Sequence, residues 1–153
     1  MSPRNTRTGA TFERIIIPAL EDQADFYEFF ARGKRTRNNC RKLPDPFRSD
    51  RTHVLDILVK ERASGAKIGI SVKWQQSSGT AEEKIAFEFL RIAKFVERRQ
   101  LDRGYIVLGG GGWTLKGYFL SSEFPKEFSS PGTSKVSVID IETLITKINT
   151  RSL

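Results

Sequence analysis

The stretch HVLDILVKERASGAKIGISVKW, residues 53–74, decides the fold of this chain. Its two ends are apolar runs rich in Ile, Val and Leu, with lengths typical of strands. The segment ASGA, residues 63–66, separates them and is typical of a turn. The stretch therefore predicts an antiparallel hairpin made of residues 53–60 and 67–74. Besides Lys60 and Lys67 at their turn ends, the predicted strands carry two charged residues within the apolar runs: Asp56 in the first and Lys73 in the second.

Pairing across this hairpin gathers polar side chains on one face. A turn at the middle of the stretch places Asp56 opposite Val72, to within one residue. Side chains alternate along a strand, so Ser71, Lys73 and Gln75 share a face. Asp56 is then a cross-strand neighbour of Ser71 and Lys73.

Two interpretations of this polar patch stay open from spacing alone. Charged groups between apolar residues cost free energy unless they are paired or bind a metal. The first interpretation is an ordinary cross-strand pair of Asp56 and Lys73. The second is phosphodiester hydrolysis. There a carboxylate holds a hard cation such as Mg²⁺, the cation activates a water, and the lysine stabilises charge at phosphorus.

The elements around the hairpin predict one three-layer α/β domain with a mixed sheet, covering residues 1–153. Pro18 suggests a kink in the first helix, and Thr80 and Asp140 are suitable N-caps for the later ones. Helices are predicted for residues 11–30, 80–99 and 140–149, and strands for residues 104–108 and 136–139. Residues 113–128 show no clear pattern.

The charge of the chain favours a polyanionic partner. Lys and Arg number 26 against 18 Asp and Glu, which gives a net charge of +8 and a pI near 9.9. Residues 1–10 form a basic arm, and residues 32–52 are expected to be a basic loop that contacts DNA. The candidate DNA-binding residues are Arg32, Lys34, Arg35, Arg37, Arg41, Lys42, Arg48 and Arg51.

Other functional classes are disfavoured by composition. No apolar run approaches the ~20 residues of a membrane span, so no membrane partner is expected. Cys40 and His53 are the only residues of their types, which excludes an internal disulfide and a zinc site. We expect an intracellular, cytoplasmic protein.

The hairpin and the run KWQQSSGTAEEKI, residues 73–85, resemble the PD-(D/E)XK nuclease superfamily. Its pattern is an Asp on one strand and an acid-x-Lys on the next, and the similarity extends over roughly residues 10–115. The resemblance implies a restriction-endonuclease-like αβββαβ core and Mg²⁺-dependent cleavage of nucleic acid, with Mn²⁺ as a substitute. It also implies that Glu13, on the first helix, is a metal-side acid. Restriction enzymes, homing endonucleases and junction resolvases share this core.

The chain departs from the pattern at one position, because Ser71 stands where the acid of acid-x-Lys belongs. Three explanations compete. A nearby acid has taken over, as resemblance to a restriction-enzyme subgroup with Ser-x-Lys and a relocated helix glutamate implies. Alternatively, the serine was introduced to trap uncut DNA, or the chain binds DNA without cutting it.

The predicted helix of residues 80–99 offers candidates for the relocated acid. Glu88 and Glu82 each flank its apolar stripe by about 60°, while Glu83 points away and fits a capping box. Glu88 lies 17 residues after Ser71, near where that subgroup places its displaced acid. An alternative role for Glu88 is an ion pair with Lys84 or Arg91. The candidate catalytic residues are Asp56, Lys73, Glu88, Gln75, Glu13 and Ser71, and the candidate metal ligands are Asp56, Glu88 and Glu13.

Three further features receive simpler interpretations. Asp45 lies between two prolines and is not expected to be the catalytic acid. The glycines at 109–112 lack nucleotide-binding spacing and predict a close backbone approach to DNA or a strand-end turn. Phe87 and Leu90 lie opposite the apolar stripe of their helix, which suggests a covering layer or a partner subunit.

The leading functional hypothesis is a sequence-specific, Mg²⁺-dependent endonuclease that acts on double-stranded DNA as a homodimer or higher oligomer. The alternatives are a DNA-binding module without catalysis and a structure-specific nuclease such as a junction resolvase.

Overall fold

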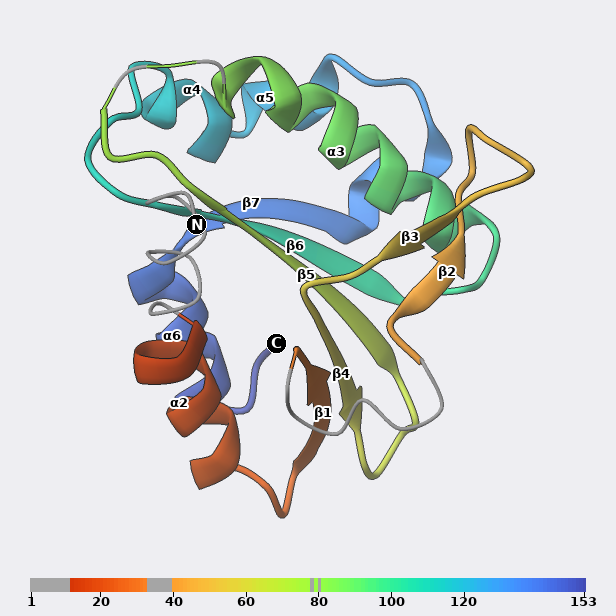
Figure 1. Ribbon diagram of the computed structural model, residues 1–153, viewed down its shortest axis with the longest axis vertical. Helices are drawn as coiled ribbons and strands as arrows, with labels where there is room; N and C mark the ends of the chain where they lie inside the picture. Colours follow the sequence, from red (N-terminus) through yellow and green to blue (C-terminus); the bar gives the residue numbers. More distant parts are fainter. Residues whose placement is uncertain (1–11, 33–39, 78, 80) are drawn as a thin grey trace.

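A five-stranded mixed sheet forms the centre of the molecule, in the order β1-β4-β5-β6-β7 (Figure 1). The computed structural model describes residues 12–32, 40–77, 79 and 81–153, apart from the side chains of residues 12, 13 and 81. The first two neighbour pairs, β1 with β4 and β4 with β5, are antiparallel, and the other two are parallel. The strands are β1 (Tyr27–Ala31), β4 (Ile57–Glu61), β5 (Lys67–Trp74), β6 (Arg103–Gly109) and β7 (Val136–Asp140).

Helices cover both faces of the sheet, which confirms the predicted three-layer α/β architecture (Figure 1). One face carries α3 (Ala81–Glu97), α4 (Lys116–Leu120) and α5 (Glu123–Lys126), and the 3-10 helix η3 (Pro131–Lys135) contacts α3. The other face carries the short π-helix η1 (Phe12–Ile16), α2 (Ile17–Asp22) and α6 (Ile141–Asn149). Each face has its own hydrophobic core. Val72 and Val107 belong to the core beneath α2 and α6, and Ile106 and Leu108 belong to the core beneath α3.

The predicted helix of residues 11–30 is wrong in its second half. The helix ends at Asp22, and Tyr27–Ala31 is the edge strand β1, paired antiparallel with β4. Burial alternates along this segment, since Tyr27 and Phe29 are buried while Glu28 and Phe30 are only partly so. A period of two with aromatic side chains is typical of a strand. Pro18 lies in the first turn of α2, where proline is tolerated, and does not kink a longer helix.

The basic segment of residues 32–52, which was expected to be entirely loop, contains one short strand and the beginning of a second. Strands β2 (Lys42–Pro44) and β3 (Thr52–Val54) form a separate two-stranded antiparallel hairpin, in which Leu43 pairs with His53. A two-stranded hairpin on the surface needs little apolar periodicity, because only one of its faces packs on the core. Lys34, Arg35, Arg37 and residues 1–10 lie outside the described residues.

The predicted strand of residues 53–60 is right only in its second half. Its first residues belong to β3, which pairs with β2 in the separate hairpin, and β4 begins at Ile57. The pairing of β4 with β5, the long helix α3, and strands β6 and β7 are as predicted. Asp140 caps α6, because its Oδ1 accepts a hydrogen bond from the Thr143 amide at 2.8 Å. Thr80 lies outside the described residues, so its predicted capping role is untested. Residues 113–128 contain α4 and α5, whose Phe119 and Phe124 pack into the core with Phe89. Among the described residues, no helix is long and apolar enough to cross a membrane.

Candidate active site

Asp56 lies directly before β4 and is held by the neighbouring strand β5. The ladder between β4 and β5 ends with the pair Ile57 and Ile70, so Asp56 comes next, level with Ser71. This is one residue from the position expected from the sequence. The Asp56 Oδ2 atom accepts a hydrogen bond from the Val72 amide at 2.8 Å. The carboxylate is thereby fixed beside the middle of β5.

Ser71 and Lys73 lie on the face of the sheet that α3 covers. In the parallel ladder with β6 they are level with Ile106 and Leu108, which pack in the core beneath α3. Their neighbour Val72 belongs to the core on the other face. Ser71 is buried and Lys73 is partly buried. The predicted alternation along β5 is therefore confirmed.

Glu88 reaches this patch from α3 and is 4% exposed. Its Oε2 lies 2.7 Å from Nη1 of Arg91, and its Oε1 lies 3.4 Å from Nε2 of His53. Burial raises the pKa of Glu88, but the adjacent imidazole of His53 and the positive charges of Lys73 and Arg91 more than offset it. The pKa falls from its ordinary 4.5 to about 2. Glu88 is therefore ionised throughout the neutral range, and the ion pair with Arg91 considered from the sequence is present.

The pKa of Asp56 moves in the opposite direction. Burial raises it, the Val72 amide and the Lys73 ammonium lower it, and the negative charge of Glu88 raises it. The balance is a raised pKa, so ionising Asp56 costs free energy in this environment. The mutual influence of Asp56, Glu88 and Lys73 shows that strands β4 and β5 and helix α3 bring these groups into one electrostatic cluster.

The donor set of this cluster fits a hard divalent cation. The buried Oε1 of Glu88 accepts no hydrogen bond from the described residues, and the nearby Asp56 carboxylate is costly to ionise. Within the described ranges, no group of three His, Cys, Asp or Glu side chains is arranged to hold a metal. Mg²⁺ needs no such group, because it commonly binds one or two carboxylates and takes its other ligands from water and substrate phosphate.

Gln75 and Glu82, two other residues considered from the sequence, bind the segment of residues 112–115. Gln75 is buried, and its Nε2 donates a hydrogen bond to the Gly112 carbonyl at 2.8 Å, so its amide is oriented toward the glycine run. Glu82 accepts hydrogen bonds from Thr114 and from the Leu115 amide, and it anchors the segment before α4. The Glu13 side chain lies outside the described residues.

The glycine run bends directly after β6 and approaches the chain's own backbone, which agrees with the strand-end turn predicted from the sequence. Gly110 has φ +88°, and a Cβ there would lie 2.3 Å from the Gln75 carbonyl oxygen. A Cβ at Gly112 would lie 2.5 Å from the backbone of Ser77. These glycines let the end of β6 close tightly over the end of β5, next to Lys73.

The β2–β3 hairpin forms one wall of the cluster. The His53 ring lies 5.9 Å from the Phe95 ring on α3, in addition to its contact with Glu88. Arg41 donates to the carbonyl oxygens of Leu55 at 2.9 Å and Asp56 at 3.4 Å, so it shapes the entry to β4. The sequence analysis did not assign His53 to the site. The available signal was its position three residues before Asp56.

Asp45 has a structural role, which agrees with setting it aside as the catalytic acid. Its Oδ1 accepts a hydrogen bond from the Phe47 amide at 2.8 Å and closes the turn after β2. Of the described basic candidates, Arg32, Lys42, Arg48 and Arg51 are exposed.

Comparison with known proteins supports the same family. A family model described as the PD-(D/E)XK nuclease superfamily domain matches residues 49–152, about two thirds of the chain. The match contains Asp56, Lys73 and Glu88, and Glu13 lies outside it. No curated protein matches the chain. Nucleases of this superfamily act on nucleic acid and generally use divalent metal ions. The chain therefore belongs to the PD-(D/E)XK nuclease superfamily.

Proposed function

We propose that the chain is a divalent-metal-dependent endonuclease that cleaves double-stranded DNA at specific sequences. The observation that carries the proposal is the meeting of Asp56, Lys73 and Glu88 between the sheet and α3. Family membership and the net charge of +8 support a nucleic-acid substrate.

In this proposal Asp56 and Glu88 hold the metal, with Mg²⁺ as the expected ion and Mn²⁺ as a substitute. When bound, the ion supplies Lewis-acid polarisation of a phosphoryl oxygen and lowers the pKa of a coordinated water. Lys73 orients the attacking water and offsets negative charge that develops at phosphorus. His53 and Arg91 position the Glu88 carboxylate through their contacts at 3.4 and 2.7 Å.

The residue at the acid position supports relocation of the missing acid. Ser71 is 3% exposed and supplies no carboxylate, so a second metal-binding acid has to come from another element. Glu88 is a buried acid on α3, and it is coupled electrostatically to both Asp56 and Lys73. Each of these properties is expected of a substitute for the strand acid.

A DNA-binding module without catalysis is the second candidate. It is favoured by the ion pair of Glu88 with Arg91, which already engages one oxygen of the carboxylate. This function predicts tight, salt-sensitive DNA binding without a cleavage product.

The test is cleavage of plasmid and oligonucleotide DNA in Mg²⁺ or Mn²⁺. Lys73→Ala should abolish cleavage while binding persists. Lys67→Ala is the matched control, because Lys67 lies on the same strand and is exposed. The nuclease proposal fails if neither the parent chain nor Ser71→Glu cleaves DNA with either metal. If only Ser71→Glu cleaves, Glu88 does not replace the strand acid.

The substrate arm of the test compares linear duplex with four-way junctions. A sequence-specific enzyme should give fixed fragments from plasmid DNA at one or a few sites. Preferential cutting of junctions would instead assign a structure-specific nuclease.

We also propose that two copies act together inside the cell, since cutting both strands of a duplex usually requires two small nuclease domains. Phe47 and Phe87 support this proposal. Their rings pack 4.9 Å apart, yet the residues remain 39% and 47% exposed. A double variant with Phe47→Ser and Phe87→Ser should convert a dimer to a monomer in light scattering. A parent chain that is monomeric with bound DNA would contradict dimerisation.

A further inference from the structure

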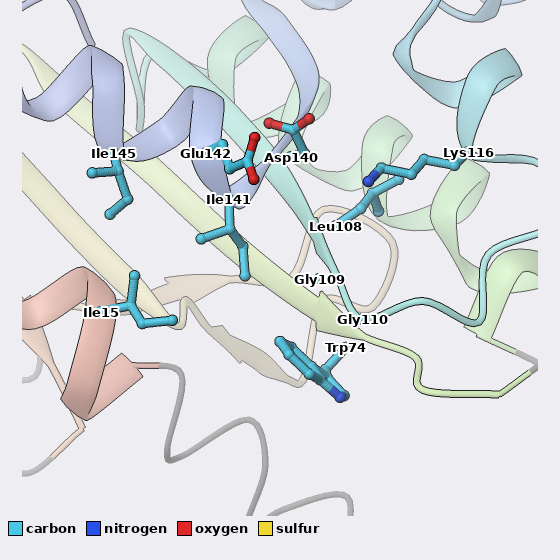
Figure 2. A pocket seen from close by; sticks show the side chains of 10 residues that line it. All are labelled: Ile15, Trp74, Leu108, Gly109, Gly110, Lys116, Asp140, Ile141, Glu142 and Ile145. Atoms are coloured by element: carbon cyan, nitrogen blue, oxygen red, sulfur yellow. The ribbon is translucent and has the colours of Figure 1, made fainter.

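A cavity of about 570 Å³ is lined by Trp74 (Figure 2), whose side chain lies on the face of the sheet opposite to that of the neighbouring Lys73. It lies where β5, β6 and β7 end, between the sheet and the segments that contain η1 and α6. Ligands of open α/β sheets bind preferentially at the carboxyl ends of the strands. Trp74 lines the cavity and directly follows Lys73 in the chain. The two sites are therefore back to back at the end of one strand.

The interior of the cavity is apolar and contains one large aromatic surface. Trp74 is partly buried, and its indole ring packs over Gly109, where a Cβ would lie only 2.6 Å from Trp74 Cε3. Ile141 approaches the same glycine, since that Cβ would lie 2.7 Å from its Cδ1. Ile15, which is 44% exposed, and Ile145 complete the apolar wall (Figure 2). The volume lies in the range of about 300–1,000 Å³ that is typical of pockets for small-molecule ligands.

The rim of the cavity carries more negative than positive groups. Asp140 and Glu142 contribute two carboxylates, and Lys116 contributes one ammonium (Figure 2). The Thr143 hydroxyl and amide hold the pKa of Asp140 below its ordinary value, so this carboxylate is ionised at neutral pH. A rim with an excess negative charge disfavours a phosphate. It favours a neutral planar group that donates hydrogen bonds from an amino group and accepts one from a lysine.

We propose that this cavity receives one unpaired nucleobase bearing an exocyclic amino group, from the strand whose phosphate lies at Lys73. The inference rests on the proposed nuclease function and refines its substrate. The base stacks on Trp74 between the isoleucine side chains, its amino group donates to the rim carboxylates, and a ring nitrogen or oxygen accepts from Lys116. The phosphate stays outside, on the face of the sheet that carries Asp56.

The expected contribution of stacking to DNA affinity can be estimated. Removing an aromatic platform costs about 1–3 kcal/mol per stacked base, which corresponds to about 5- to 150-fold in affinity. The loss should fall on DNA with an unpaired base and should spare fully paired DNA. The quantity to measure is therefore the ratio of the two dissociation constants.

The experiment uses a duplex with a single bulged 2-aminopurine and a fully paired duplex of the same sequence, both in EDTA. For the parent chain we expect tighter binding of the bulged duplex, with a change in 2-aminopurine fluorescence. Trp74→Leu should reduce the preference by about 5- to 150-fold. Ile15→Trp should do the same by filling the cavity from its exposed side. Leu115→Trp is the matched control, since Leu115 is 48% exposed and does not line the cavity.

Three outcomes would overturn the proposal. One is an unchanged preference in both Trp74→Leu and Ile15→Trp. Another is equal binding of a bulged purine that lacks the amino group. The third is saturable binding of free 2-aminopurine riboside that competes with DNA of either type, which would make the cavity a small-molecule site. No arm of the experiment requires metal or cleavage. The binding results would therefore test the cavity even if the chain did not cleave DNA.

Discussion

Glu88→Gln should destabilise the metal-free protein, and the structure sets the size of the effect. A fall in the pKa of Glu88 from 4.5 to about 2 corresponds to about 3 kcal/mol in favour of the charged form. Glutamine removes the charge but keeps one oxygen that accepts a hydrogen bond from Arg91. We therefore expect a loss of about 2–3 kcal/mol, which lowers the Tm of a chain of this length by about 4–12 °C.

The assay is urea or thermal unfolding in EDTA at pH 7. Glu83→Gln is the matched control, because Glu83 lies on the same helix and is exposed. A variant at position 88 that is as stable as the parent chain would refute the ion-pair account of this carboxylate.

The same reasoning fixes a pH dependence. Because the folded-state pKa of Glu88 is depressed, its contribution is present above the unfolded pKa near 4.5. The contribution is lost as the pH falls toward about 2. The stability of the parent chain should therefore drop more steeply over this interval than that of Glu88→Gln. Parallel curves would contradict the depressed pKa.

Three further outcomes follow from the site and its surroundings. Asp56→Asn should stabilise the metal-free protein at pH 7, because the raised pKa of Asp56 makes its charge unfavourable above that pKa; a lowered Tm in EDTA would contradict this. Gly110→Ala should cost about 1–3 kcal/mol in urea unfolding, since φ is +88° and a Cβ meets a carbonyl oxygen at 2.3 Å. Gly111→Ala, whose Cβ meets nothing within 4 Å, should leave stability nearly unchanged. Equal losses of stability in the two variants would contradict the close approach of Gly110 to the Gln75 carbonyl. Arg51→Glu should weaken DNA binding and make the salt dependence of the affinity shallower, while the exposed Lys126→Glu changes it less; the reverse order would move the DNA interface away from the β2–β3 hairpin.

The parts of the fold that the sequence predicts correctly are those whose signals are local. The strands β4 and β5 are adjacent in the chain and joined by a short turn, so their pairing needs little information from elsewhere. The helix α3 has an apolar stripe with helical period, and Asp140 has the residue type and position of an N-cap. In each case the residues that define the element lie within it.

The errors arise where a distant partner decides the structure. The segment of residues 27–31 becomes a strand because it pairs with β4, about thirty residues later, and its aromatic residues are compatible with either a helix or a strand. The polar pairing of β2 with β3 leaves no apolar pattern to read. The contact of His53 with Glu88 joins residues that are 35 positions apart, and it depends on how the hairpin packs on α3.

If Glu88 on α3 replaces an acid at position 71 on β5, the active site is connected to the β2–β3 hairpin. An acid at position 71 would belong to β5, whereas Glu88 lies on α3 and contacts His53 on the β2–β3 hairpin. That hairpin carries the exposed Arg48 and Arg51 in its connecting segment. A shift of the hairpin on DNA would therefore alter the surroundings of Glu88 directly. The pKa of Asp56 is raised and that of Glu88 is lowered. A bound metal ion would therefore stabilise the ionised form of Asp56, whereas at Glu88 it would compete with Arg91 and His53. Under the proposed function, DNA contact and metal affinity would depend on the same few side chains.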